Sequence, residues 1–171
     1  MSYRDSTLAI ADASESATLR VFRNHDVFRD HDEATFIVLA PGIVAGFMAS
    51  AVALADLSLA AYLRKLPLGL EPPDERGQLI KTFTTLTDEI RDYDPPIAEA
   101  KVSRLARAEP LHIGRVAYRD AALRRGLSGW TRGASATACE LCLSLADGTV
   151  LSWDTLPVDH PGCACVQVPV N

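Results

Sequence analysis

All four cysteines of this 171-residue chain lie in its last quarter, where they form two short clusters. Cys139 and Cys142 make the first cluster, and His160, Cys163 and Cys165 make the second. Two thiolates three residues apart form a short chelating turn. A histidine and a cysteine three residues apart across Pro-Gly form another. The pattern therefore predicts a tetrahedral zinc site in a small C-terminal fold.

Five candidate ligands compete for the four positions of that site. Cys139, Cys142 and His160 have the clearest spacing, and Cys163 completes the second turn. Cys165 could replace Cys163 if the chain is extended there, because side chains two residues apart then share a face. The spacing leaves this choice open. The stretch between the clusters, 143–159, has about the length of a hairpin that would bring them together.

Disulfides and buried or redox-active thiols are the alternatives to zinc. Disulfides persist in oxidising compartments. The first twelve residues contain acidic side chains and lack the apolar core of a signal peptide. We therefore expect reduced thiolates bound to metal.

The same residues carry a family resemblance. The segments that carry it are Gly129–Ser135, Ala138–Ala146, His160–Cys165 and Val168–Val170. They resemble the C-terminal domain of phage minor head proteins of the Mu F type, in which Cys-x-x-Cys precedes His-Pro-x-Cys-x-Cys near a proline-containing strand. A Gly-Trp-x-Arg lead-in is frequent in tailed phages of actinobacteria. The resemblance covers about residues 127–170, and the rest of the chain is similar only in being helical.

The resemblance implies a virion structural protein rather than an enzyme. Such a minor capsid protein would assemble in the host cytoplasm, enter the phage head near the portal protein, and contact other head proteins and packaged DNA. It implies structural zinc, no membrane partner and no small-molecule substrate. A small zinc-dependent enzyme of head maturation and a membrane-active protein using residues 34–63 are the alternatives.

The sequence as a whole predicts a mainly α-helical chain with one core and a small zinc-stabilised β-hairpin domain at its C-terminus. Hydrophobic residues make up 48% of the chain and charged residues 23%, which is enough apolar surface for one globular core. We expect an N-terminal arm or weak helix over 1–33, a helical domain over 34–126 and a zinc-binding domain over 127–171.

The run 34–55 contains no charged residue and is long enough to cross a membrane. Pro41-Gly42 interrupts it, alanine and glycine dilute it, and Asp56 follows directly. Beyond Gly42 apolar residues recur at helical spacing as far as Leu63. We therefore expect a long, mostly buried helix that ends near Pro67.

Proline and glycine residues indicate the helix boundaries in the remaining chain. Asp74 predicts the start of a helix over 74–93, and two shorter helices are expected over 97–107 and 111–125, separated at Pro110. Gly126 is expected to cap the last helix. Two strands, 149–153 and 166–170, should pair as a hairpin, with Trp153 covering the metal site or packing in an ordinary core.

Charge is distributed unevenly around a net charge of -5. Residues 97–135 hold 8 basic and 3 acidic side chains, whereas the segments on either side are acidic. A basic island of this kind indicates either a solvated helix face or contact with DNA phosphates or an acidic partner. Its candidate contact residues are Arg104, Arg107, Arg115, Arg119, Arg124 and Arg125.

Catalytic patterns are weak in this chain. A zinc deaminase needs His-x-Glu ahead of its Cys-x-x-Cys, and no such motif precedes Cys139. There is also no His-Glu-x-x-His helix and no glycine-rich phosphate loop. Two complete chelating turns would close the coordination sphere, which is typical of structural zinc.

Overall fold

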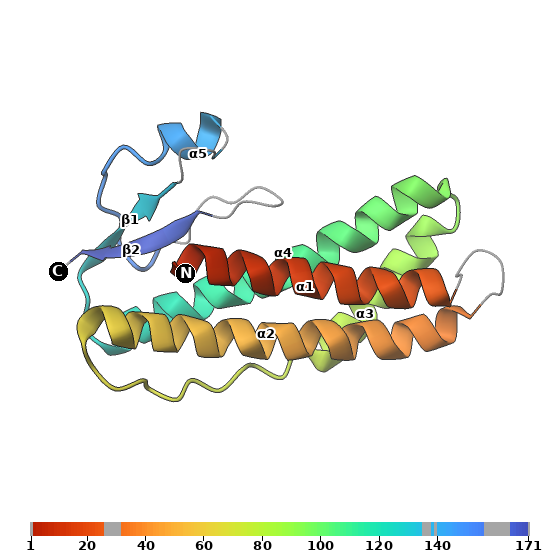
Figure 1. The fold of residues 1–171 in the computed structure, drawn as a ribbon, viewed down its shortest axis with the longest axis horizontal. Helices are drawn as coiled ribbons and strands as arrows, with labels where there is room; N and C mark the ends of the chain where they lie inside the picture. The colour runs from red at the N-terminus through yellow and green to blue at the C-terminus, as the bar shows by residue number, and fades with distance from the viewer. Residues whose placement is uncertain (1, 26–31, 135–137, 139, 156–164, 171) are drawn as a thin grey trace.

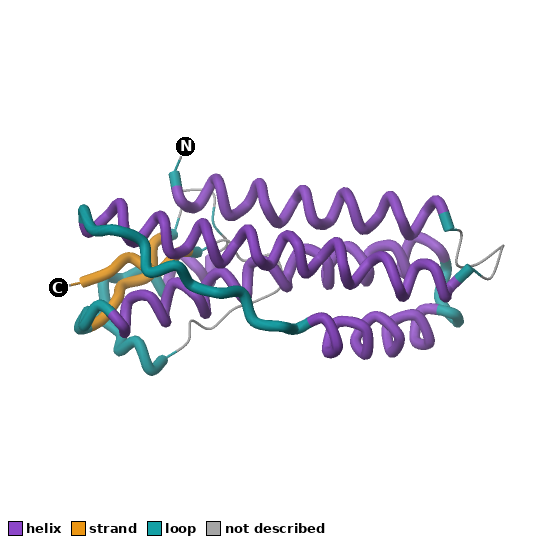
Figure 2. Tube along the Cα trace, turned by 90° about the horizontal axis from the view of Figure 1, so that it is seen from below, coloured by secondary structure: helices purple, strands orange, loops and turns teal. Residues whose placement is uncertain are grey.

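The computed structural model describes residues 2–25, 32–134, 138, 140–155 and 165–170. Long helices run side by side in these residues, and a small two-stranded sheet lies at one end of the bundle (Figures 1 and 2). The elements in chain order are α1 (Tyr3–Asn24), α2 (Glu33–Leu63), α3 (Arg76–Ile90), α4 (Pro95–Arg124), β1 (Gly129–Gly133), α5 (Glu140–Ser144) and β2 (Val166–Val170). The expectation of a mainly helical chain with a small sheet is confirmed.

The first segment is a full member of the bundle rather than an extended arm. Helix α1 begins with a capping box, in which the Asp5 amide donates to Ser2 Oγ at 3.2 Å and the Ser2 amide donates to Asp5 Oδ2 at 3.1 Å. Most of its sequence is polar, but one side of the helix is buried. This side contacts both α2 and α4. The buried residues on that face are Ala11, Ser14, Thr18 and Phe22.

Helix α2 confirms the expected long apolar helix and corrects its boundaries. It begins at Glu33 and passes through Pro41 without a break, so the interruption expected at Pro41-Gly42 was wrong. Pro41 is itself buried, and packing against the bundle offsets the cost of about 3 kcal/mol of an interior proline. The helix is less buried than expected, because only 33% of its most apolar 18-residue window lies inside.

Helix α4 corrects a second expectation based on proline. Residues 95–124 form one helix, not two, with Pro95 at the first position, where a missing amide costs nothing. Pro110 lies inside it and leaves the Ala106 carbonyl without its usual helical donor. The buried Ser14 hydroxyl on α1 donates to that carbonyl at 2.7 Å. A neighbouring helix thus supplies the hydrogen bond that proline removes.

The end of α4 agrees with the expected glycine cap. Gly126 has a φ of 71°, which favours glycine, and its amide donates to the Leu123 carbonyl at 3.0 Å. The Leu127 amide donates to the Ala122 carbonyl at 3.1 Å, which completes a Schellman motif. Helix α3 is shorter than the expected 74–93, and Glu75 rather than Asp74 occupies its N-cap position.

Replacing Ser14 by alanine should destabilise the chain by about 1–3 kcal/mol, because the buried Ala106 carbonyl loses its donor. The cost should fall when Pro110 is also replaced by alanine, since residue 110 then offers an amide to the same carbonyl. Chemical denaturation of both single variants and the double variant measures this coupling. Equal costs of Ser14→Ala in the two backgrounds would contradict the assignment.

Candidate metal centre and its surroundings

The small sheet pairs different segments from those expected. β2 lies antiparallel to β1, with Gly129 opposite Val170 and Gly133 opposite Val166, so the 149–153 partner was wrong. An isolated bridge joins the expected strand to the sheet, through the Trp130 amide and the Leu151 carbonyl at 2.9 Å and the reciprocal bond at 2.8 Å. The sequence did not predict β1, because the strand begins and ends with glycine, which is typical of turns.

Those glycines leave room for close neighbours: the Leu151 backbone at Gly129, and valine side chains of β2 at Gly133. A Cβ at Gly129 would lie 2.8 Å from the Leu151 carbonyl oxygen, and one at Gly133 would lie 2.9 Å from a Val168 methyl carbon. Both distances are shorter than real Cβ contacts. The Gly-Trp-x-Arg-Gly segment is therefore shaped by packing between neighbouring chain segments.

Two tryptophans attach the sheet to the helical bundle. Trp130 is fully buried and Trp153 is 1% exposed. The Trp153 ring lies 6.3 Å from both Trp130 and Tyr118 of α4, and Arg119 donates to the Trp153 carbonyl. These rings belong to the main core, so Trp153 has the ordinary core role that the sequence left open.

The N-terminus of α1 closes the same core from its other side. Tyr3 stacks on Tyr118 with 5.0 Å between ring centroids. Burial raises the pKa of Tyr3 to about 12, because the ionised ring would lose its hydration, although a side-chain hydrogen bond with Thr7 acts in the opposite direction. The first turn of α1 therefore packs its aromatic ring against α4 at the end of the bundle that carries the sheet.

Two of the five candidate ligands fall within the described residues, and they share one buried cluster. Cys142 lies on α5 and is 3% exposed, and Cys165 directly precedes β2 and is 9% exposed. Ala134 and Ala138 pack against both, and this cluster is separate from the main core. The fold thus brings together one member of each cysteine-containing cluster, 23 positions apart in the sequence.

The other three candidates, Cys139, His160 and Cys163, lie outside the described residues. Within the described residues no group of three or more histidine, cysteine, aspartate or glutamate side chains could hold a metal ion. The two thiols that are described fit zinc by their chemistry, since thiolates and imidazoles in small, apolar surroundings are the usual ligands of structural sites.

The basic island is largely involved in contacts within the chain. Arg107 pairs with Asp12 and with Glu15 of α1, the latter at 3.3 Å. Arg119 binds the Trp153 carbonyl, as described above, and Arg115 is half-buried and borders a crevice beside Tyr3. These arginines connect α4 to α1 and to the C-terminal segment.

The remaining arginines differ in exposure. Arg124 pairs with Asp120 one turn before it at 2.9 Å, and the Arg125 side chain is only 6% exposed. Arg104 is exposed on α4. Four of the candidates, Arg104, Arg107, Arg115 and Arg119, fall on one side of α4 by helical spacing, whereas Arg124 points elsewhere.

A buried aspartate that sequence reasoning did not single out organises the loop after α2. The Asp56 carboxylate accepts the amides of Leu68, Gly69 and Leu70 at 2.9, 2.7 and 3.3 Å. Arg125 lies 3.8 Å from the same carboxylate and donates to the Leu66 carbonyl at 2.5 Å. One buried charge pair therefore joins α2, the loop and the end of α4. Its only sequence signal was a lone acid inside an apolar helix.

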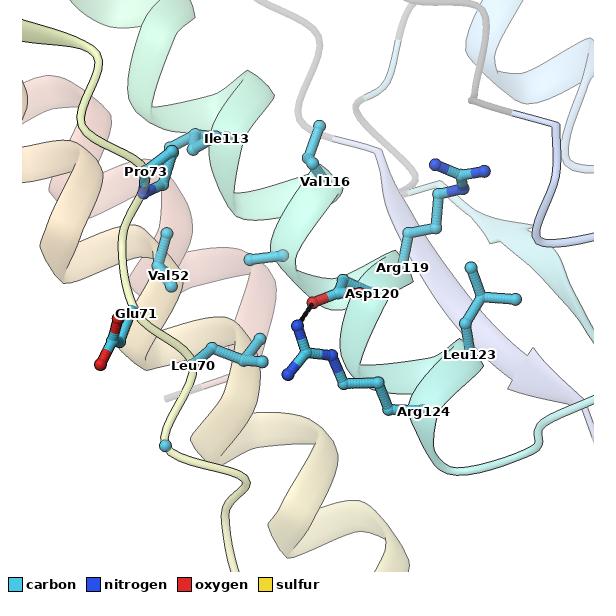
Figure 3. A pocket seen from close by; sticks show the side chains of 12 residues that line it. Val52, Leu70, Glu71, Pro73, Ile113, Val116, Arg119, Asp120, Leu123 and Arg124 are labelled. Carbon is cyan, nitrogen blue, oxygen red and sulfur yellow. Dashed lines mark ion pairs between the residues drawn. The ribbon is translucent and has the colours of Figure 1, made fainter.

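That loop forms one wall of a groove of about 570 Å³ between α2 and α4 (Figure 3). Val52, Leu70 and Ile113 make its walls apolar, while Arg119 and the Asp120–Arg124 ion pair line its other end. The described lining contains no serine, cysteine or histidine, so no nucleophile with its base is present there.

Comparisons with protein-family models, with curated proteins and with solved structures found no match for this chain. The resemblance to Mu F-type proteins therefore rests on the residues quoted above alone.

Replacing Asp56 by alanine should destabilise the fold by about 3–5 kcal/mol, because Arg125 would remain buried without its partner. Adding Arg125→Met should recover part of the loss, since the uncompensated charge is then removed. Thermal and urea denaturation of the three variants provide the comparison. A cost for Asp56→Ala below about 1 kcal/mol, the range of an exposed ion pair, would contradict this account.

Proposed function

We propose that this chain is a structural protein of a tailed-phage virion, a minor head protein of the Mu F type that associates with the portal. The observation that carries the proposal is the pattern Cys139-x-x-Cys142 followed by His160-Pro-Gly-Cys163-Ala-Cys165, together with its Gly-Trp-x-Arg lead-in. The close packing of Cys142 with Cys165 supports it, because a shared metal requires the two clusters to converge.

Zinc would be held by four of the five candidates, Cys139, Cys142 and His160 with Cys163 or Cys165. Bound there, it would tie α5 to the start of β2 and stabilise a segment that has little apolar core of its own. The chain's own part is to keep Cys142 and Cys165 buried among small side chains, with the tryptophan core nearby.

Exposed apolar side chains around α5 support a role in assembly. Leu141, Leu143 and Leu145 are 50%, 45% and 39% exposed, and Val150 is 57% exposed. Exposed apolar side chains on a metal-stabilised segment would be more typical of a protein contact than of a catalytic cleft. This surface is our candidate for contact with other head proteins.

The enzyme alternative lacks an observation in its favour. A hydrolytic zinc site keeps an open coordination position next to a substrate cleft. The 570 Å³ groove is lined by α2, α4 and their connecting loop, whereas the cysteine cluster involves α5 and β2. Its described lining contains no serine, cysteine or histidine.

The membrane alternative conflicts with the packing of α2. This helix is the one among the described residues that is long and apolar enough to span a bilayer. Its inner face, however, contacts α1, α3 and α4, and inserting it would require either breaking that core or burying charged neighbours.

The metal proposal predicts about one zinc per chain of protein purified without chelator. Cys139→Ser and Cys142→Ser should each abolish stoichiometric binding, because a tetrahedral site loses a ligand. Cys163→Ser and Cys165→Ser should differ from one another, and the variant that loses zinc identifies the fourth ligand. Elemental analysis with native mass spectrometry measures this.

Ser144→Ala provides a matched control, since Ser144 is an exposed residue of α5 outside the ligand set. Retention of zinc by all four cysteine variants would contradict the proposal. So would purified protein that contains no zinc and does not take it up.

The location proposal predicts a complex with the portal protein of the same phage on co-expression, and the presence of this chain in purified heads. Arg104→Ala should weaken binding of this chain to the portal protein or to DNA. The binding of wild-type protein to these partners should fall as the salt concentration rises. Arg20→Ala, an exposed arginine of α1, is the control. Heads that lack the chain, together with no salt-sensitive binding to portal or DNA, would contradict the proposal.

A further inference from the structure

The outward face of α2 is apolar along the whole helix. No acidic or basic residue occurs between Ala34 and Ala55, and Asp56 points inward. Val38, Leu39 and Leu57 are 62%, 43% and 55% exposed. In a helix of about 46 Å this is a continuous uncharged surface. Apolar surface of this extent is rarely left open to water.

The middle of that face allows very close approach. Gly42 and Gly46 are exposed, and a Cβ built on either would meet nothing within 4 Å. Ser50 follows one turn later, and its hydroxyl donates to the Gly46 carbonyl at 3.0 Å, so it needs no further partner. Small side chains of this kind let two helix axes approach at the short end of the usual range.

Two residue pairs of the face are symmetric in size about its middle. A twofold axis at the level of Met48 would place Gly46 opposite Ser50 and Leu39 opposite Leu57 of a second chain. Two small residues then meet at the centre and two leucines meet on either side of it, whereas the exposed Val38 has no apolar partner in this register. An isologous contact needs this self-complementarity, because each chain offers the same patch.

The two ends of the helix carry opposite charge. Asp32, Asp88 and Asp92 surround its beginning, where Arg91 pairs with Glu33 at 3.0 Å. Exposed Arg64 and Lys65 follow its last turn, and neither has an ion-pair partner among the described residues. An antiparallel arrangement brings each acidic end to a basic end, and it also opposes the two helix dipoles favourably.

We propose that the outward face of α2 binds the same face of a second copy of this chain, as an antiparallel twofold dimer centred at Gly46 and Ser50. The occupant is a copy of the chain rather than a bilayer, because the same register places the acidic Asp32 opposite the basic Arg64 of the second chain. The inference is independent of the head-protein proposal.

The test compares two glycine substitutions in the purified full chain. Wild-type protein at micromolar concentration should have twice the 18.4 kDa mass of one chain by light scattering coupled to size exclusion. Gly46→Gln should be monomeric, with the dissociation constant raised at least about 100-fold. Gly77→Gln, at an exposed helical glycine of α3 with nothing within 4 Å, should remain dimeric.

Neither substitution clashes within the monomer, and both replace a weak helix former, so the melting temperature should not fall. Loss of the dimer therefore reports on the interface. Wild-type protein that is monomeric at about 100 μM would overturn the proposal. So would a dimer that Gly46→Gln leaves intact, or a chain that sediments with vesicles of mixed neutral and anionic phospholipid.

The direction of pairing has its own readout. Leu39→Lys and Leu57→Glu should each weaken the dimer, because each buries a charge opposite leucine. Combined in one chain they should restore it, since an antiparallel dimer places lysine opposite glutamate twice. A double variant weaker than both single variants would overturn the antiparallel arrangement.

Discussion

The structure depends on the inward face of one apolar helix. Helix α2 contacts α1, α3 and α4, and its buried stripe supplies much of the main core. Phe36 lies edge-on to Phe22 of α1 and to Phe83 of α3, with ring centroids 5.3 and 5.6 Å apart. Farther along, alanines permit close helix packing; Gly114 of α4 lies against Ala51. Burial of this stripe outweighs the cost of the interior proline.

Buried polar groups then determine how the other elements meet α2 and α4. Ser14 supplies the donor that Pro110 removes, which fixes α1 against α4. The Asp56 carboxylate accepts hydrogen bonds from three loop amides and pairs with the Arg125 guanidinium. These contacts hold the loop and the end of α4 in place. Each group is satisfied by a segment distant in sequence. A buried polar atom that is satisfied in only one arrangement makes that arrangement specific.

The sequence predicted what depends on local chemistry. The long apolar helix, the Gly126 cap and the mainly helical composition follow from periodicity and glycine geometry. It failed where a distant partner decides the outcome. Pro110 and Pro41 predicted breaks because nothing nearby shows that the bundle compensates for them. β1 was missed because its glycines serve contacts with Leu151 and Val168.

In the candidate site, too, residues with a local sequence signal were predicted and residues that depend on distant partners were not. Spacing alone named Cys142 and Cys165, and the fold brings them into one cluster. The arginines were named from charge, yet Arg107, Arg119 and Arg125 are occupied by partners that no local pattern reveals. The sequence showed Asp56 only as an acidic residue next to an apolar run. Its structural role was not predictable, because its hydrogen-bond donors are amides of a loop more than ten residues away.

The bundle is organised around α2, and we propose that a metal ion stabilises only the C-terminal segment attached to it. Hydrogen exchange with and without a zinc chelator tests this most directly. The account predicts that amides of α2 and of the middle of α4 keep their protection after chelation, whereas α5 and β2 lose theirs. Unchanged protection of α5 and β2, or loss of protection throughout the bundle, would contradict it.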